Sequence, residues 1–374
     1  MPRALTDVVV MGMMTKAGSL SRRCVVKRVG SNAGRMPMWS EPIRLMQRVG
    51  QQLLGMVRRL LSPVDTLVES APHPGPGKVV ALRRLERVLV SSAVLQSLFD
   101  MFAEHRRSER GEEETGWVLL GYRREAEAIA LAALPAGMHR EAGVAHVRFN
   151  TLAQAVATRI LRARDRQLTI LGVVHTHPGS LRHPSRGDYE GDSEWVKLLR
   201  GKEGVFGIGT VEADDVSDGL PMVVQPTENS WYWRGLRFNW YTLAAGDRHY
   251  RPIPVQVVLG EDLARPFLPV WETLEYHAAG LEELFRRLSV LNVEVLSEIV
   301  DGKSSDCLSL SIPMENGQEI RALLSGPKMR FYYDDGEQTY EVESEPPVDR
   351  GIFLLLAELA RRRELCETSI ESEP

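Results

Sequence analysis

The sequence predicts an α/β protein in which helices and strands alternate around a mixed sheet, followed by a separate α+β module. Between residues 79 and 247, short apolar stretches alternate with amphipathic segments of helical periodicity. After residue 248, one helical segment precedes a run of strand-like segments and a last helix. Residues 70–78 contain three prolines and two glycines, which disfavour helix and sheet and predict a linker. We therefore divide the chain into residues 1–78, 79–247 and 248–374.

The composition is that of a soluble globular protein, with 43% hydrophobic and 26% charged residues among 374. The net charge of −4 gives no general reason to expect a nucleic-acid partner. The three cysteines (Cys24, Cys307 and Cys366) are too few and too scattered for a disulfide framework or a cysteine-based zinc site. No apolar run approaches the roughly 18 to 20 residues that span a bilayer. We expect a cytoplasmic protein without a transmembrane segment.

The first 62 residues are rich in arginine and lysine, and their only acidic residues are Asp7 and Glu41. This imbalance is typical of an organellar transit peptide, but an extended tail, or a start assigned upstream of the true one, explains it as well. Residues 40–61 predict an amphipathic helix that Ser40 caps, with Pro42 in its first turn. Its apolar face either packs on protein or lies on an anionic membrane surface.

The sequence of residues 79–247 predicts a series of helices and strands. Residues 79–90 are rich in Val, Leu and Arg, and a helix is expected at 91–105. Thr151 and Gln154 have the spacing of a capping box, which predicts a helix from 151 to about 165. A further helix is expected at 188–199. Strands are expected at 117–121, 128–134, 145–149, 168–174, 205–211 and 222–225, and paired strands at 230–243.

The C-terminal segment predicts a helix, an antiparallel meander and a second helix. The helices are expected at 271–288 and 348–364. Asp-Gly or Asn-Gly pairs at 301–302, 316–317 and 335–336 are strong signals for hairpin turns. The strands are expected at 293–300, 308–314, 320–325, 329–333 and 339–343.

One stretch, residues 175–188, carries the pattern of a catalytic metal site. His175 and His177 lie two residues apart at the end of a predicted strand, so their side chains point the same way and can share one ion. Prolines and a glycine then turn the chain away, and it returns with Ser185 and Asp188 at a predicted helix start, where the helix dipole favours a carboxylate. Two histidines and one aspartate leave the fourth tetrahedral position for water, as in catalytic zinc sites.

Together with Glu114, this stretch resembles the JAMM (MPN+, JAB domain) zinc metalloprotease family, bacterial type. The family combines a glutamate with His-x-His, seven residues, Ser, two residues and Asp. Glu114 begins the sequence Glu-Thr-Gly-Trp-Val-Leu-Leu-Gly, and the spacing between His177, Ser185 and Asp188 fits in full. The resemblance covers roughly residues 80–245. It implies a JAMM-type mixed curved sheet flanked by helices.

The resemblance also implies the role of each residue. His175, His177 and Asp188 would bind Zn²⁺. Glu114 would act as the general acid and base on the water, and Ser185 would stabilise the oxyanion. No other cofactor is expected.

The family implies the expected function and substrate class. Its members mostly cleave peptide or isopeptide bonds after the C-terminal glycine of ubiquitin-like proteins or sulfur carriers. We expect a zinc isopeptidase or peptidase acting on a ubiquitin-like protein or its conjugates, in a bacterial conjugation or antiphage defence system. Two alternatives stay open: processing of a sulfur-carrier protein, and a non-catalytic scaffold in a larger assembly. The sequence does not indicate the oligomeric state.

Near the predicted strand at 117–121, the catalytic glutamate has to be chosen among three neighbours, and the side chain of Trp117 has two possible positions. Glu112 and Glu113 adjoin Glu114, which is preferred because it alone directly precedes the Thr-Gly pair and the apolar strand. Trp117 stands where many relatives have a second glycine after Gly116. Its side chain either packs beneath the strand or narrows the substrate channel.

Three residues of the predicted loop have open roles. Arg182 and Arg186 either attract a substrate carboxylate or only add surface charge. His183 is expected to be exposed or to contact substrate, because three ligands and water already fill a tetrahedral site.

Overall fold

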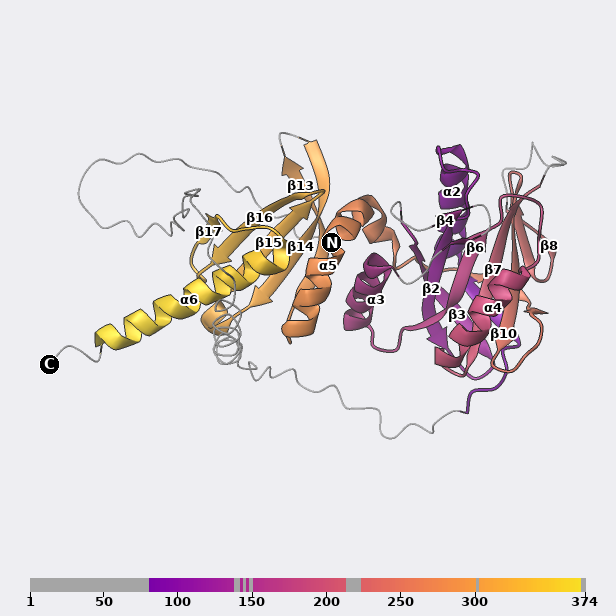
Figure 1. Ribbon diagram of the computed structural model, residues 1–374, viewed down its shortest axis with the longest axis horizontal. Coiled ribbons are helices and arrows are strands. Elements are labelled where there is room, and N and C mark those ends of the chain that lie inside the picture. The colour runs from indigo at the N-terminus through magenta and orange to yellow at the C-terminus, as the bar shows by residue number, and fades with distance from the viewer. Residues whose placement is uncertain are drawn as a thin grey trace, which may run out of the picture. The chain divides into compact units, whose positions relative to one another are not determined.

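The computed structural model describes residues 81–137, 142–143, 146–147, 151–212, 223–300 and 303–370. The predicted linker, the basic N-terminal segment and its amphipathic helix lie outside the described residues. Two sheets with their covering helices account for most of what is described (Figure 1). Among these helices, none combines the length and apolar character needed to cross a membrane.

The larger sheet is mixed and has ten strands. Its order is β12-β1-β3-β2-β6-β7-β10-β9-β8, with β11 paired to β10. Strand β1 runs parallel to β3 and β12, and β6 parallel to β7, whereas β2 is antiparallel to both β3 and β6. The strands are β1 Arg87–Ser91, β2 Gly116–Arg123, β3 Glu127–Pro135, β6 Thr169–Thr176, β7 Glu203–Val211, β8 Val224–Thr227, β9 Ser230–Trp233, β10 Leu236–Ala244, β11 Arg251–Pro252 and β12 Val255–Val258.

Helices cover this sheet because its central strands are apolar on both faces. Along β2, Trp117 and Leu119 belong to the core with helix α2, while Val118 and Leu120 belong to the core with helix α3. Val173 shares the α3 core, so alternation along β6 places His175 on that face as well. The helical segments are α2 Ser92–Arg107, α3 Leu152–Arg164, α4 Arg186–Trp195 and the 3₁₀ turn η1 Val196–Leu198; a short pair, β4 Ala142–Gly143 and β5 His146–Val147, precedes α3.

The mixed sheet with flanking helices confirms the predicted fold class, and several local signals are confirmed too. Thr151 and Gln154 form the predicted capping box of α3. The helix expected at 91–105 is α2, and the structure shows Ser91 as its N-cap. Helix α4 begins at Arg186, two residues before the predicted start, because Ser185 is its N-cap. Of the strand predicted at 145–149, only β5 lies within the described residues.

Strands β11 and β12 were not predicted. They follow the predicted domain boundary at residue 247, yet β12 joins the larger sheet beside β1, with Val88 paired to Val255. The larger sheet therefore extends past that boundary, to Val258.

The C-terminal segment forms a second, antiparallel sheet with two helices, as predicted. Its five strands follow chain order, β13-β14-β15-β16-β17. Helix α5 holds the β15–β16 turn, because Thr273 Oγ1 accepts the Gly326 N–H at 2.8 Å and His277 Nε2 donates to its carbonyl at 2.9 Å. The elements are η2 Arg265–Val270, α5 Trp271–Arg287, β13 Asn292–Val300, β14 Lys303–Pro313, η3 Glu315–Gly317, β15 Glu319–Ser325, β16 Lys328–Asp334, β17 Thr339–Val342 and α6 Val348–Ile370.

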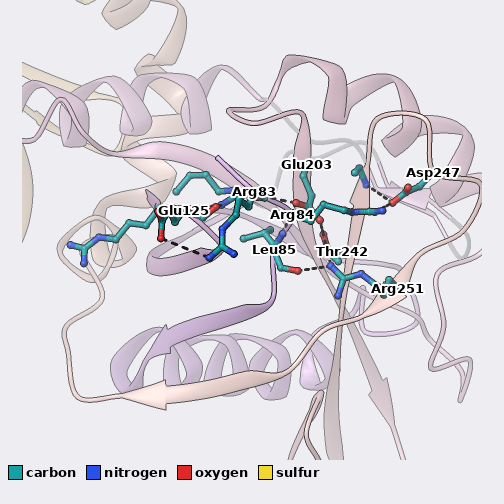
Figure 2. Close-up of polar contacts among 11 residues, drawn as sticks. Arg83, Arg84, Leu85, Glu125, Glu203, Thr242, Asp247 and Arg251 are labelled. Carbon is teal, nitrogen blue, oxygen red and sulfur yellow. Dashed lines mark hydrogen bonds and ion pairs between the residues drawn. The ribbon is translucent and has the colours of Figure 1, made fainter. Parts of the chain in front are cut away.

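A buried ionic contact fastens the chain that leads into β1. Glu203, the first residue of β7, accepts the Leu85 N–H at 2.7 Å and the Thr242 hydroxyl at 2.9 Å (Figure 2). Its carboxylate also lies 3.4 Å from Arg123, and both side chains are only 2% exposed. A buried charge is costly without partners, so the Glu203 carboxylate favours keeping these contacts. They hold residue 85 at the end of β7 that lies opposite the histidines.

Candidate metal centre

The pairing of β2 with β6 brings Glu114 to the histidines. Gly116 lies opposite His175 in the antiparallel register. Thr115 and Thr176 continue the pairing, since the Thr176 N–H donates to the Thr115 carbonyl at 2.9 Å and the Thr115 N–H donates to Thr176 Oγ1 at 3.0 Å. One further step in this register sets Glu114 opposite His177.

His175, His177 and Asp188 gather their donor atoms at one point. The two Nε2 atoms are 3.1 Å apart, and the Asp188 carboxylate oxygens lie 3.2 Å from His175 Nε2 and 3.4 Å from His177 Nε2. Ligands about 2.0–2.1 Å from a tetrahedral zinc ion lie roughly 3.3 Å from one another. These separations, which involve both oxygens of the Asp188 carboxylate, are close to those between zinc ligands, and the two nitrogens and one carboxylate are donors that zinc accepts.

The ring of His177 is held in the orientation that a metal ligand needs. Its Nδ1 lies 2.7 Å from the Leu181 carbonyl oxygen, and its backbone N–H donates to the Gly209 carbonyl at 2.8 Å. A carbonyl can only accept, so Nδ1 carries a proton and Nε2 is turned toward Asp188.

Asp188 is oriented by the start of its own helix. Ser185 Oγ accepts the Asp188 N–H at 3.2 Å, and an Asp188 carboxylate oxygen accepts the Ser185 N–H at 2.5 Å. This reciprocal capping box explains the Ser-x-x-Asp spacing of the motif. The hydroxyl of Ser185 uses its oxygen as an acceptor here, so its proton is still available to a neighbouring oxygen.

Two aromatic hydroxyls hold the rest of α4 against the sheet. Tyr189 Oη donates to the Asp247 carbonyl at 2.9 Å, and Tyr250 Oη donates to the Asp192 carboxylate at 2.7 Å. Asp192 follows Asp188 by one helical turn, so the contact with Tyr250 sets the face that α4 presents to the histidines. Asp192 and Tyr250 carry no motif signal, and no local sequence pattern pairs them.

The charges of the cluster follow from this geometry. Burial acts to raise the pKa of Asp188, but hydrogen bonds to His175 and His177 outweigh it and lower this pKa well below its usual range. Burial acts to lower the pKa of His177, but hydrogen bonds to Asp188 and Leu181 outweigh it and raise this pKa. Asp188 is thus held ionised, as a metal ligand must be.

Glu114 differs sharply from its two acidic neighbours. Its side chain is 4% exposed, and burial raises its pKa to about 7, with His177 lowering it and Asp188 adding to the rise. Glu113 instead pairs with Arg110, and Glu112 is exposed beside Arg106. A carboxylate that exchanges its proton near neutral pH suits general acid–base work.

Trp117 lies in the core, which decides between the two interpretations of its side chain. Its side chain is 1% exposed, its Nε1 donates to Met101 Sδ at 3.2 Å, and its ring meets the Phe238 ring edge-on. Trp117 therefore packs beneath the strand, on the α2 side of the sheet, and does not narrow a channel on the α3 side.

The loop residues have distinct environments. Arg182 pairs with Glu212 through two nitrogens, so its charge is largely neutralised. Arg186 is 92% exposed and pairs along α4 with Glu190. His183 is exposed, and its Nδ1 lies 3.0 Å from the Tyr241 hydroxyl.

Comparison with known proteins identifies the domain that carries this site. A search of curated proteins found no match. The solution structure of protein DSY2949 from Desulfitobacterium hafniense is 13% identical over 46% of this chain and 94% of that chain, with a TM-score of 0.28. Residues 95–225 match the model of the family described as prokaryotic homologs of the JAB domain, and this range holds all five motif residues. The chain therefore carries a JAB/MPN-type domain of the bacterial type.

Proposed function

We propose that the chain is a zinc-dependent peptidase or isopeptidase that cleaves after the C-terminal glycine of a ubiquitin-like protein. One observation carries the proposal: two histidines and an aspartate, whose donor atoms lie within 4.8 Å of one another, stand beside a buried glutamate with a raised pKa. The JAB domain match supports it, because that family includes metalloproteases. The ubiquitin-like substrate comes from the resemblance to JAMM enzymes, and the cellular setting is expected to be the cytoplasm.

Each residue of the site has a chemical task under this proposal. Zinc, when bound by His175, His177 and Asp188, supplies a Lewis acid for polarising the scissile carbonyl and activating water. Glu114 takes a proton on its carboxylate and returns it to the leaving amine, which its pKa of about 7 permits. The Ser185 hydroxyl donates its proton to the developing oxyanion while its oxygen caps α4.

Cleavage by purified, zinc-loaded protein tests the proposal. One substrate is a ubiquitin-like protein fused through its diglycine tail to a reporter, and another is a sulfur carrier extended beyond its diglycine. Glu114→Gln should reduce cleavage by at least 10²-fold while zinc still binds at one equivalent. Glu113→Gln, which alters an adjacent glutamate paired with Arg110, is the matched control and should remain active.

The outcomes separate the alternatives. Cleavage of the sulfur carrier alone would favour the metabolic role, whereas zinc binding without cleavage of either substrate would favour the scaffold. Full activity of Glu114→Gln would refute the assigned acid–base role.

A further inference from the structure

Arg182, in the loop between His177 and Ser185, is bound to the sheet through both its backbone and its side chain. The Tyr241 hydroxyl donates to the Arg182 carbonyl at 2.8 Å. The Arg182 guanidinium donates through Nε to Glu212 Oε1 at 2.9 Å and through a second nitrogen to the other carboxylate oxygen. Backbone and side chain of the same residue are thus both fixed, and a two-point arginine–carboxylate contact is the most directional ion pair in proteins.

The two residues that anchor Arg182 lie in or directly beside the larger sheet. Glu212 directly follows β7, and its N–H donates to the Gly235 carbonyl at 2.8 Å. Its carboxylate also pairs with Arg237 at 3.1 Å and is only 10% exposed. Tyr241 lies in β10, the antiparallel neighbour of β7, and is 4% exposed. The carboxylate end of the ion pair is thus sheltered, whereas the Arg182 side chain is 46% exposed, so solvent screens this pair more than a fully buried one.

Arg182 adjoins the Leu181 carbonyl, which orients the ring of His177. Leu181, whose carbonyl accepts the proton on His177 Nδ1 at 2.7 Å, is bonded directly to Arg182. Leu181 has an exposed side chain, at 52%, so its side chain does little to fix its position. The place of the Leu181 carbonyl therefore depends on the contacts of Arg182 with Tyr241 and Glu212.

We propose that Arg182, together with Glu212 and Tyr241, is a positioning residue for the metal ligand His177. The contacts of Arg182 with Glu212 and Tyr241, which we call the pin, hold the Leu181 carbonyl in place. There the carbonyl fixes the tautomer and tilt of the His177 imidazole and thereby strengthens metal binding. Partners that orient a ligating histidine typically change metal affinity by about 10- to 100-fold when they are removed. The proposal rests on the metal site of the proposed function and is independent of the substrate.

This role differs from the substrate guidance that the sequence left open for Arg182. A guanidinium bound at two points to a sheltered carboxylate has little net charge to offer a substrate carboxylate. Arg186 has the opposite character, because it is 92% exposed and its pair with Glu190 one turn along a helix contributes little. Arg186 is therefore the matched control: an arginine close to the same ligands without an anchor in the sheet.

Zinc affinity, measured by competition with a chromophoric chelator at fixed pH, tests the pin. The full-length variants are Arg182→Met, Glu212→Gln, Tyr241→Phe and Arg186→Met. We expect the first three to bind zinc about 10- to 100-fold more weakly and Arg186→Met to bind within twofold of the wild type. Arg182→Lys, which keeps one contact with Glu212, should lie between Arg182→Met and the wild type.

A second measurement distinguishes positioning from general destabilisation. In the metal-free protein, the His177 Nδ1–H resonance should exchange faster with solvent in Arg182→Met, while the far-UV circular dichroism stays that of the wild type. Tyr241→Phe removes one oxygen from a buried ring and serves as the variant least able to unfold the domain.

Three outcomes would be decisive. Unchanged zinc affinity and unchanged His177 exchange in folded Arg182→Met and Tyr241→Phe would overturn the pin. An equal loss of affinity in Arg186→Met would overturn it too, because it would assign the effect to loop charge. Absence of zinc binding by the wild type would instead refute the metal site of the proposed function.

Discussion

Ser185 and Asp188 fix one another at the start of α4, each side chain accepting the backbone N–H of the other residue. The serine is thus part of the helix cap as well as a candidate for oxyanion stabilisation. The two roles make different demands, because a cap needs an acceptor oxygen whereas an oxyanion needs a donor.

Substitutions at Ser185 should separate these roles. Ser185→Ala removes both, and we expect it to lower the free energy of unfolding by about 1 kcal/mol and to weaken zinc binding. Ser185→Asp keeps a good cap but, when ionised, has no proton to donate, so stability should stay near that of the wild type while kcat falls. Urea unfolding, chelator competition and cleavage assays measure the three quantities. A normal kcat in Ser185→Asp would leave Ser185 with the capping role alone.

Trp117 should matter for stability and not for the substrate, because it is buried on the α2 side of the sheet. We expect Trp117→Ala to lower the free energy of unfolding by about 3–5 kcal/mol, and Trp117→Phe by less. Zinc affinity and KM of Trp117→Phe should match those of the wild type. A lowered KM with unchanged stability would contradict the packing role and favour a channel-lining one.

The buried pair of Arg123 and Glu203 should show strong coupling (Figure 2 draws the contacts of Glu203). Arg123→Met leaves the glutamate buried near the more exposed Arg251, and we expect a loss of about 3–5 kcal/mol in the free energy of unfolding. Arg123→Met combined with Glu203→Leu should lose less than the sum of the single variants. Urea unfolding of the four proteins gives the coupling, and strict additivity would show that the pair does not interact.

How far the sequence predicts this site depends on the distance along the chain between interacting residues. The ligand spacing, the capping box and the choice of Glu114 depend on local patterns, which a sequence carries, whereas the strand register that brings Glu114 to His177 joins residues far apart in the chain. The contacts of Arg182 with Glu212 and of Tyr250 with Asp192 join residues far apart in sequence. The pairing of β12 with β1 does so as well. Such contacts need the topology of the sheet, which a single sequence leaves open between many arrangements.

Asp192 should make the stability of the metal-free protein depend on pH. Burial raises its pKa to about 7, with the Tyr250 hydrogen bond opposing and the charge of Asp188 adding to the rise. A carboxyl whose pKa is higher in the folded than in the unfolded state favours folding in its protonated form. Its contribution is therefore fully present below about pH 4, the unfolded pKa, and is lost as the pH rises through about 7.

Asp192→Asn should remove this dependence, because the amide oxygen still accepts the Tyr250 hydroxyl and never ionises. Unfolding by urea in the presence of a chelator should show the variant moderately more stable than the wild type at pH 5, which already lies above the unfolded pKa. At pH 8 the difference should be larger than at pH 5, by on the order of 2 kcal/mol. Glu114 titrates in the same range in both proteins, so its contribution cancels in the difference. A difference that stays constant between pH 5 and pH 8 would show that Asp192 is ionised throughout, and that the contact with Tyr250 holds α4 through a charged hydrogen bond.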